Sequence, residues 1–186
     1  MLHFWDQSWD LRLAECPCDM HFLEWLEENK IKDQSIFHFG TGSHHIVGLK
    51  TAGDGSNNAV LGITASPAEY DAYVKMLIEK PRLGHTYKAY FGDIYQLDAR
   101  LLPTFDIVTL FHAGEFRTEK NDSYGGLTDL EMTKILAGRM KPGGQMLFYS
   151  GSYAFDVAQR VFEELVKTGV LVDAGAFKTL QIFTKI

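Results

Sequence analysis

Ser35-Ile36-Phe37-His38-Phe39-Gly40-Thr41-Gly42-Ser43 is the stretch that decides the fold. Its apolar residues predict a buried strand, and two glycines follow that strand at once, before a segment with helical character. In α/β proteins, a strand that runs through glycines into a helix presents backbone N–H groups to a ligand. Gly40 permits a tight turn there, and Gly42 has no Cβ to keep a ligand away from the backbone.

Strands and helices alternate along the chain around this stretch. An apolar face that includes Phe22 and Leu26 predicts a helix over 20–29, with Asp19 as its cap. Further predicted helices cover 43–52, 67–80, 128–140 and 152–168, with Ser66, Thr128 and Ser152 as their caps or starts. The predicted strands before residue 150 cover 36–39, 59–63, 86–91, 106–111 and 145–149. Such alternation predicts a mostly parallel sheet with helices on both faces.

The end of the chain breaks this alternation. Strands are predicted over 170–172 and 179–185, with a turn at Gly175 between them. The connection is too short for the crossover that parallel strands need. The last strand is therefore expected to run antiparallel to its neighbour in a sheet of seven strands.

Composition excludes several classes of function. The chain has 186 residues, of which 46% are hydrophobic, and this suits one domain with a sizeable core. A formal net charge of −6 and the lack of a lysine- or arginine-rich run argue against nucleic acid as a partner. No stretch approaches the roughly 18–20 apolar residues of a membrane span. Asp6 and Asp10 do not fit a signal peptide, so we expect a cytoplasmic protein with no membrane partner.

Cysteine and histidine, which often bind metals, cluster at two places. Cys16 and Cys18 are separated by one residue, so a disulfide between them would be strained, and two cysteines alone do not make a zinc site. His44 and His45 are adjacent and would point about 100° apart on a helix. His38 lies inside the apolar strand, where it is expected to be buried and hydrogen-bonded. The sequence therefore predicts reduced thiols and no metal site.

With these elements in order, the chain resembles class I S-adenosylmethionine-dependent methyltransferases over about residues 20–186. The resemblance implies a single-domain, Rossmann-like methyltransferase fold, with an N-terminal lid or helix over 1–33 and a core over 34–186. It rests on the order and spacing of short motifs that match the family's glycine loop, second strand, adenine-side turn, fourth strand and a common later turn. These motifs are Gly40-Thr41-Gly42, Leu61-Gly62-Ile63-Thr64-Ala65-Ser66, Gly92-Asp93-Ile94, Phe105-Asp106-Ile107-Val108 and Met140-Lys141-Pro142-Gly143-Gly144.

The sequence departs from the family's pattern at three positions. His38 and Thr64 stand where the family usually carries an acid, and His44 stands near the usual third small residue. The acid after the second strand accepts hydrogen bonds from the ribose hydroxyls in that family. A threonine offers only one neutral hydroxyl there, so we expect weak cofactor binding that Thr64→Asp would strengthen.

The resemblance also implies which residues form the site. His112, as a base, and Glu115 follow the fourth strand at the carboxyl edge of the sheet and would be catalytic. An alternative stays open for the glycines, which can form a structural turn without a ligand, and for Asp93, which can simply stabilise a turn. The residues expected to bind the cofactor are Phe39, Gly40, Thr41, Gly42, Thr64, Ala65, Asp93, Ile94 and Phe111.

Two functions follow from these observations. The first is an S-adenosylmethionine-dependent methyltransferase that acts on a small molecule, and the second is a non-catalytic protein of the same fold that serves as a binding or regulatory subunit. A nucleotide-binding oxidoreductase fits less well, because the acid after the second strand is missing and the terminal hairpin reverses.

Trp5 and Trp9 either close over the ligand site or cover the edge of the core. Whether the protein forms a homo-oligomer stays open.

Overall fold

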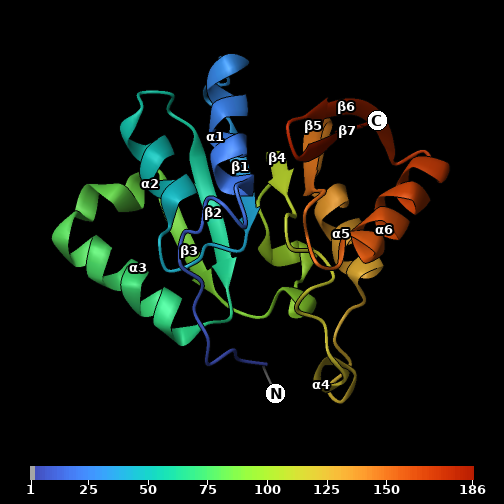
Figure 1. The fold of residues 1–186 in the computed structure, drawn as a ribbon, viewed down its shortest axis with the longest axis horizontal. Helices are drawn as coiled ribbons and strands as arrows, with labels where there is room; N and C mark the ends of the chain where they lie inside the picture. Colours follow the sequence, from blue (N-terminus) through green and yellow to red (C-terminus); the bar gives the residue numbers. More distant parts are fainter. Residues whose placement is uncertain (1–2) are drawn as a thin grey trace.

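The computed structural model describes residues 3–186 as a seven-stranded sheet with helices on both faces (Figure 1). Met1 and Leu2 lie outside the described residues. The strands are β1 (Ser35–Phe39), β2 (Ala59–Thr64), β3 (Tyr87–Phe91), β4 (Phe105–Thr109), β5 (Met140–Tyr149), β6 (Leu171–Phe177) and β7 (Leu180–Lys185). The helices are α1 (Cys18–Glu28), α2 (Ile46–Gly53), α3 (Pro67–Glu79), α4 (Glu119–Asp122), α5 (Asp129–Gly138) and α6 (Phe155–Lys167), with 3-10 turns η1 (Pro81–His85), η2 (Ile94–Gln96) and η3 (Ala99–Leu101).

The order of strands in the sheet is β3-β2-β1-β4-β5-β7-β6. β1, β2, β3, β4 and β5 run parallel, whereas β7 pairs antiparallel with both β5 and β6. Only Lys178 and Thr179 separate β6 from β7, which leaves no room for a crossover. The predicted reversal of the last strand is confirmed, and so is the predicted class of fold.

Alternate residues of the strands enter two separate cores. Ile36 and Ile107 pack in the core beneath α1, α2 and α3. Phe37 and Val108, the next residues of the same strands, pack in the core beneath α5 and α6. Figure 1 shows these two groups of helices on opposite sides of the strands. Among the helices of residues 3–186, none is long and apolar enough to span a membrane.

The starts of two helices differ from the prediction. α1 begins at Cys18 with Pro17 at its N-cap position, so Asp19 lies within the first turn and does not cap the helix. α2 begins at Ile46 rather than at residue 43, because His45 has a left-handed backbone with φ of 47°. A residue in that conformation cannot continue an α-helix.

Two of the three other predicted helix caps are confirmed. Ser66 and Thr128 cap α3 and α5 as predicted, since each side chain accepts a backbone N–H from the third residue of its helix. The prediction for Ser152 is wrong, because Ala154 occupies the N-cap position of α6.

Two strands also end differently from the prediction. β4 ends at Thr109 rather than at Phe111. The predicted turn at Gly175 is wrong, because this residue lies within β6 at a shift of the pairing register. The chain instead reverses at Lys178, whose φ of 52° is left-handed.

The segment Lys141-Pro142-Gly143-Gly144, predicted to end a helix, forms a bulge within β5 opposite β4. Lys141 Nζ lies 2.7 Å from Oδ1 of Asp106, and Oδ2 of Asp106 accepts hydrogen bonds from the Ser35 N–H and hydroxyl at 2.8 and 2.7 Å. A Cβ on Gly144 would lie 2.7 Å from the carbonyl oxygen of Asp106. Asp106 therefore ties β4 to both neighbouring strands, and glycine permits the close approach.

Gly48→Ala should lower the free energy of unfolding by about 1–3 kcal/mol, as overpacking of a core does. A Cβ at this position of α2 would lie 2.3–2.5 Å from the ring of Tyr87 in β3. Gly53→Ala in the same helix is the matched control, because its Cβ would have no neighbour within 4 Å. Urea unfolding measures both variants, and equal loss in the two would contradict the packing of α2 on β3.

Asp106→Asn should make the stability of the protein fall less steeply as the pH is lowered. Partial burial alone would raise the pKa of Asp106, but the hydrogen bonds from Lys141 and Ser35 outweigh it and hold the pKa below its usual value. The stability that Asp106 contributes is therefore present above about pH 4 and is lost as the pH falls through the lowered pKa of the folded state.

Thermal unfolding of the wild type and of Asp106→Asn between neutral and acidic pH measures this effect. Asp156→Asn is the control, since Asp156 pairs with Arg160 on the exposed surface of α6 and such pairs contribute little. If the melting temperatures of wild type and Asp106→Asn fall in parallel as the pH is lowered, the stability that Asp106 contributes does not depend on its charge.

Candidate functional site

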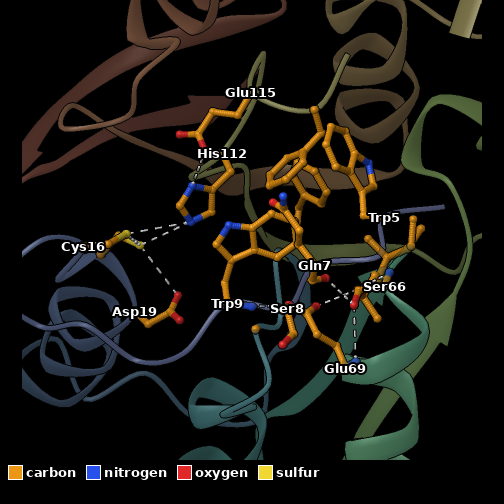
Figure 2. A pocket seen from close by; sticks show the side chains of 18 of the residues that line it. Trp5, Gln7, Ser8, Trp9, Cys16, Asp19, Ser66, Glu69, His112 and Glu115 are labelled. Carbon is orange, nitrogen blue, oxygen red and sulfur yellow. Dashed lines mark hydrogen bonds and ion pairs between the residues drawn. The ribbon is translucent and has the colours of Figure 1, made fainter. Parts of the chain in front are cut away.

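The loops that follow β1, β2, β3, β4 and β5 surround a cavity of about 500 Å³ at the carboxyl edge of the sheet (Figure 2). Residues 3–16, called the N-terminal segment below, form a further wall, and Trp5, Trp9 and Cys16 of this segment line the cavity. The volume falls within the range of small-molecule sites, roughly 300–1,000 Å³. Open α/β sheets bind their ligands at this edge.

Most of the residues predicted for the site line this cavity. Two do not. Phe111 is 1% exposed and packs edge-on against Phe22 in the core, so its side chain does not line the cavity. Thr41 is equally buried and directs its hydroxyl to a carboxylate oxygen of Glu69 at 3.4 Å. The predicted residues that do line the cavity are Phe39, Gly40, Gly42, Thr64, Ala65, Asp93, Ile94, His112 and Glu115.

The glycine turn has the left-handed backbone that its residues permit, with φ of 91° at Gly40 and 56° at Gly42. The space beside these glycines is occupied by other groups of the protein. A Cβ on Gly40 would lie 3.0 Å from the ring of His112. A Cβ on Gly42 would lie 2.3 Å from Nε2 of His44 and 2.8 Å from the carbonyl oxygen of Trp9. Gly42 therefore allows the N-terminal segment to approach the backbone, and Gly40 allows the ring of His112 to do so.

A buried carboxylate that the sequence analysis missed lies beside Thr64. Oε2 of Glu69 accepts a hydrogen bond from the Thr64 hydroxyl at 2.7 Å, and Oε1 accepts one from the Trp9 N–H at 3.2 Å. Burial raises the pKa of Glu69, whereas these hydrogen bonds and that from Thr41 act in the opposite direction. Because the side chain lines the cavity, it places an acid at the end of β2 after all.

The sequence holds a local signal for Glu69. It follows Ser66 by three residues, and this spacing predicts a capping box at the start of a helix. The Ser66 side chain does accept the Glu69 N–H, but the Glu69 carboxylate turns to Thr64 instead of returning to the cap.

Asp93 stabilises a turn, in line with the alternative that was left open for it. Its Oδ1 accepts the Tyr95 N–H at 2.8 Å at the start of η2. Its Oδ2 accepts a hydrogen bond from the Tyr124 hydroxyl and lies 3.5 Å from the Asn121 amide. The carboxylate still borders the cavity beside Ile94.

The N-terminal segment binds directly to the loops of the sheet. The Trp5 N–H donates to the carbonyl oxygen of Ala65 at 3.1 Å, and the Ser66 hydroxyl donates to that of Gln7 at 2.7 Å. Trp5 and Trp9 both pack edge-on against Phe116, at centroid distances of 5.3 and 5.1 Å. The segment thus forms one wall of the cavity, and backbone hydrogen bonds and an aromatic cluster hold it there.

His112 and Glu115 form a hydrogen-bonded pair at another part of the cavity. His112 Nδ1 lies 3.1 Å from Oε2 of Glu115, and the Ser152 hydroxyl donates to Oε1 of Glu115 at 2.5 Å. Burial would lower the pKa of His112, but its hydrogen bonds to Cys16 and Glu115 raise it to about 10. Burial would raise the pKa of Glu115, but His112 and Ser152 hold it below its usual value.

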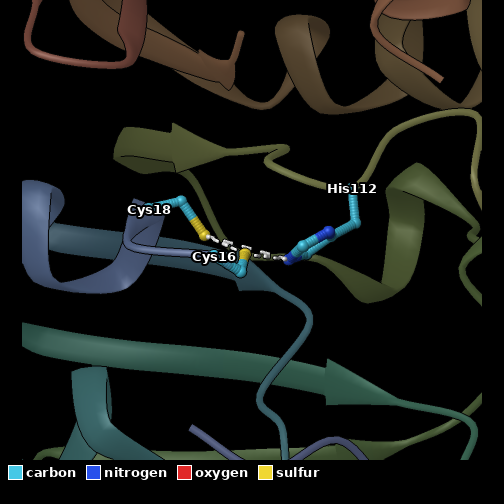
Figure 3. A group of neighbouring side chains, drawn as sticks. All are labelled: Cys16, Cys18 and His112. Carbon is cyan, nitrogen blue, oxygen red and sulfur yellow. Dashed lines mark hydrogen bonds between the residues drawn. The ribbon is translucent and has the colours of Figure 1, made fainter. Parts of the chain in front are cut away.

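The two cysteines meet Nε2 of His112 on the other side of its ring (Figure 3). The sulfur atoms of Cys16 and Cys18 are 3.4 Å apart, and each lies 3.9 Å from this nitrogen. The hydrogen bond from Cys18, aided by His112, lowers the pKa of Cys16 to about 5 against the effect of burial. The same bond, burial and the carboxylate of Asp19 raise the pKa of Cys18.

His38, His44 and His45, which the sequence places near the glycine turn, make different contacts. His38 is buried and hydrogen-bonded to the Thr109 hydroxyl at 2.8 Å, as predicted, and burial lowers its pKa to about 3. His45 contacts the Tyr87 hydroxyl and the backbone oxygen of Glu69. Nε2 of His44 lies 3.8 Å from Asp19.

Comparison with known proteins finds similar solved structures but no similar sequence. No protein-family model matches the sequence, and no curated protein matches it significantly. The N-methyltransferase NodS from Bradyrhizobium japonicum WM9, crystallised with S-adenosylhomocysteine, has a TM-score of 0.62 and 14% identity, over 94% of this chain and 90% of NodS. A precorrin-6y methyltransferase from Geobacter metallireducens GS-15 has a TM-score of 0.62 and 12% identity, over 99% of this chain and 94% of the other.

The cyclase SpnF has a TM-score of 0.60 and 16% identity, over 92% of this chain and 64% of SpnF. Several matched proteins are longer than this chain, which spans between 38% and 64% of them. At these identities the comparison establishes architecture. The chain has the fold of the class I S-adenosylmethionine-dependent methyltransferases.

Proposed function

We propose that this protein transfers a methyl group from S-adenosylmethionine to a small molecule. The observation that carries the proposal is the cavity at the carboxyl edge, which combines the glycine turn after β1 with a buried acid at the end of β2. The fold supports it, because structures with this fold include methyltransferases, and NodS was crystallised with S-adenosylhomocysteine. The volume of the cavity also suits a small molecule.

Glu69 takes the place of the ribose-binding acid in this proposal. An ionised carboxylate offers about four acceptor positions, and the contacts with Thr41, Thr64 and Trp9 use three of them. The glycine turn would face the methionine part of the cofactor, and Asp93 with Ile94 would border the adenine. A second carboxylate at position 64 would face Glu69 within hydrogen-bond distance, so we now expect Thr64→Asp to weaken binding rather than to strengthen it.

The N-terminal segment acts as a lid in this proposal. Its hydrogen bonds to Ala65, Ser66 and Glu69 hold it against the groups assigned to the cofactor. Cofactor entry therefore requires those bonds to open, and closure excludes water from the reacting groups. The rest of the region expected to be a lid or helix, through residue 33, contains α1, which packs in the core and stays in place in this proposal.

His112 and Glu115 are the proposed catalytic pair. Figure 2 shows them and Cys16 at one end of the cavity and Ser66 and Glu69 at the other, with Trp9 between them in this view. A cofactor held at Glu69 would direct its other end toward the pair, where the methyl acceptor binds. Methyl transfer gains most from holding donor and acceptor in line, and the pair activates the acceptor.

A binding or regulatory protein without methyl transfer is the second candidate. It is favoured by the carbonyl oxygen of Trp9 and the ring of His44, which fill the space beside Gly42. SpnF, a cyclase, has the same architecture, so the fold does not by itself require methyl transfer.

Binding of S-adenosylhomocysteine should change the tryptophan fluorescence, because Trp5 and Trp9 line the proposed site. Trp9→Phe should lose much of the change, whereas Trp25→Phe should keep it, because Trp25 packs in the core with 4% exposure. A fluorescence titration of wild type and both variants measures this. No saturable change in the wild type, or a change lost only in Trp25→Phe, would contradict the proposed site.

Glu69→Gln should weaken binding of S-adenosylhomocysteine about ten-fold or more, since charge-assisted hydrogen bonds contribute roughly 1.5–3 kcal/mol. Glu79→Gln, at the exposed end of the same helix, is the matched control and should bind as the wild type does. Calorimetric titration gives the affinities, and circular dichroism verifies that each variant is folded. Equal affinity for Glu69→Gln and Glu79→Gln would remove Glu69 from the site.

A further inference from the structure

Cys16, Cys18 and His112 bring three metal-binding atoms together in a group that the sequence analysis did not foresee. The two sulfur atoms and Nε2 of the histidine all lie within 4.8 Å of one another (Figure 3). Cys16 belongs to the N-terminal segment, Cys18 opens α1, and His112 follows β4. Two distant parts of the chain thus bring sulfur and nitrogen atoms, which are common zinc ligands, close together.

The spacing of these atoms suits a zinc ion. Tetrahedral zinc with bonds of about 2.3 Å to sulfur and about 2.0–2.1 Å to nitrogen places two sulfurs about 3.8 Å apart, and sulfur and nitrogen about 3.6 Å apart. The observed separations are 3.4 Å between the sulfurs and 3.9 Å from each sulfur to Nε2. Small movements of the side chains therefore bring all three atoms to coordination distance.

The surroundings of His112 are those of a metal ligand. Its Nδ1 faces the carboxylate of Glu115 at 3.1 Å, and Glu115 is in turn fixed by the Ser152 hydroxyl at 2.5 Å. Such a carboxylate fixes the tautomer and the ring orientation of a metal-binding histidine. Nδ1 of His112 is thereby engaged in the hydrogen bond with Glu115, and Nε2 is directed toward the two sulfurs.

A disulfide and a cysteine nucleophile are two other possible roles for Cys16 and Cys18, and each explains less of the geometry than a metal site does. A disulfide between residues separated by one position is strained, and the sulfurs are 3.4 Å apart and unbonded. A cysteine nucleophile activated by His112 needs a single thiol, yet Cys18 is placed as symmetrically as Cys16 although it is only 1% exposed. A metal site accounts for both cysteines.

We propose that Cys16, Cys18 and His112 bind a zinc ion at the wall of the cavity. Two thiolates with an imidazole favour zinc over magnesium or calcium, which prefer oxygen ligands. All three residues line the cavity, so the remaining coordination position is available to water or to a substrate, as in zinc sites with three protein ligands. Asp19 Oδ1, 3.9 Å from Cys18 Sγ, lies beside the ligands.

This assignment does not depend on the proposed methyl transfer, but it refines the role of His112. A histidine that binds zinc through Nε2 has no free nitrogen with which to accept a proton, since Nδ1 is used by Glu115. The acceptor would instead be activated by coordination to the ion. It also departs from the expectation of no metal site, because His112 adds a third possible ligand to the two cysteines.

Titration of the full chain with zinc, after removal of metals by a chelator under reducing conditions, tests the proposal without any cofactor. We expect one zinc ion per chain, with proton release as the thiols ionise. Cobalt in place of zinc should give the visible bands of a four-coordinate ion and a near-ultraviolet sulfur-to-cobalt charge-transfer band.

Variants then assign the ligands. Cys16→Ser, Cys18→Ser and His112→Gln should each abolish the stoichiometric site, and Glu115→Gln should weaken it about 10–100-fold. His85→Gln, on the exposed turn η1, is the matched control and should bind zinc as the wild type does.

A wild-type cobalt spectrum without the sulfur band would overturn the proposal even where a variant fails to fold. Stoichiometric binding that survives in a folded Cys16→Ser or Cys18→Ser variant would overturn it as well. So would thiol titration that finds the two cysteines joined as a disulfide in the protein as purified, with no zinc bound after reduction. If the wild-type protein binds zinc but not S-adenosylhomocysteine, the proposed methyl transfer is rejected and the metal site is retained.

Discussion

The register of β1 between two parallel neighbours is the constraint on which the site depends. Phe39 pairs with Ile63 of β2, and His38 pairs with Thr109 of β4. The three strands therefore leave the sheet at nearly the same level, and their next residues form neighbouring loops. The buried hydrogen bond between His38 and Thr109 adds a polar link at this level.

The cavity that results has two chemically different ends, and the N-terminal segment contributes to both. At one end, Trp9 donates its N–H to the buried carboxylate of Glu69. At the other end, Cys16 approaches His112 beside the first residue of α1. A metal at the second end would fasten the base of the segment to the loop after β4. The part of the segment that contains Trp5 and Trp9 would then be free to open from a fixed point.

Local signals were sufficient to predict most of the fold. The apolar run before Gly40 and the helix start at Ser66-Pro67 each act through a few neighbouring residues and lie where the sequence predicts. The reversal of the last strand is also confirmed, although its turn lies at Lys178. The errors arose where backbone conformation overrode composition. His45 adopts a left-handed φ that delays α2, and Gly175 lies in a bulge of β6 instead of the turn.

The site was less accessible to sequence reasoning, because its main contacts join distant residues. Cys16 and His112 are 96 positions apart, and nothing near either one indicates the other. The spacing of Glu69 from Ser66 predicts a helix start, and the Glu69 N–H does donate to the Ser66 side chain there. The direction of its carboxylate depends on Thr64 and Trp9, and thus on the packing of three segments.

The most direct test of the central claim is a crystal structure of the protein grown with S-adenosylhomocysteine. The account predicts the ligand in the cavity, its ribose hydroxyls hydrogen-bonded to the Glu69 carboxylate, and its sulfur directed toward His112. It also predicts that the hydrogen bond between Trp9 and Glu69 is rearranged to admit the ribose. A cavity still closed by Trp9 at saturating ligand, or a ligand bound away from Glu69, would contradict it.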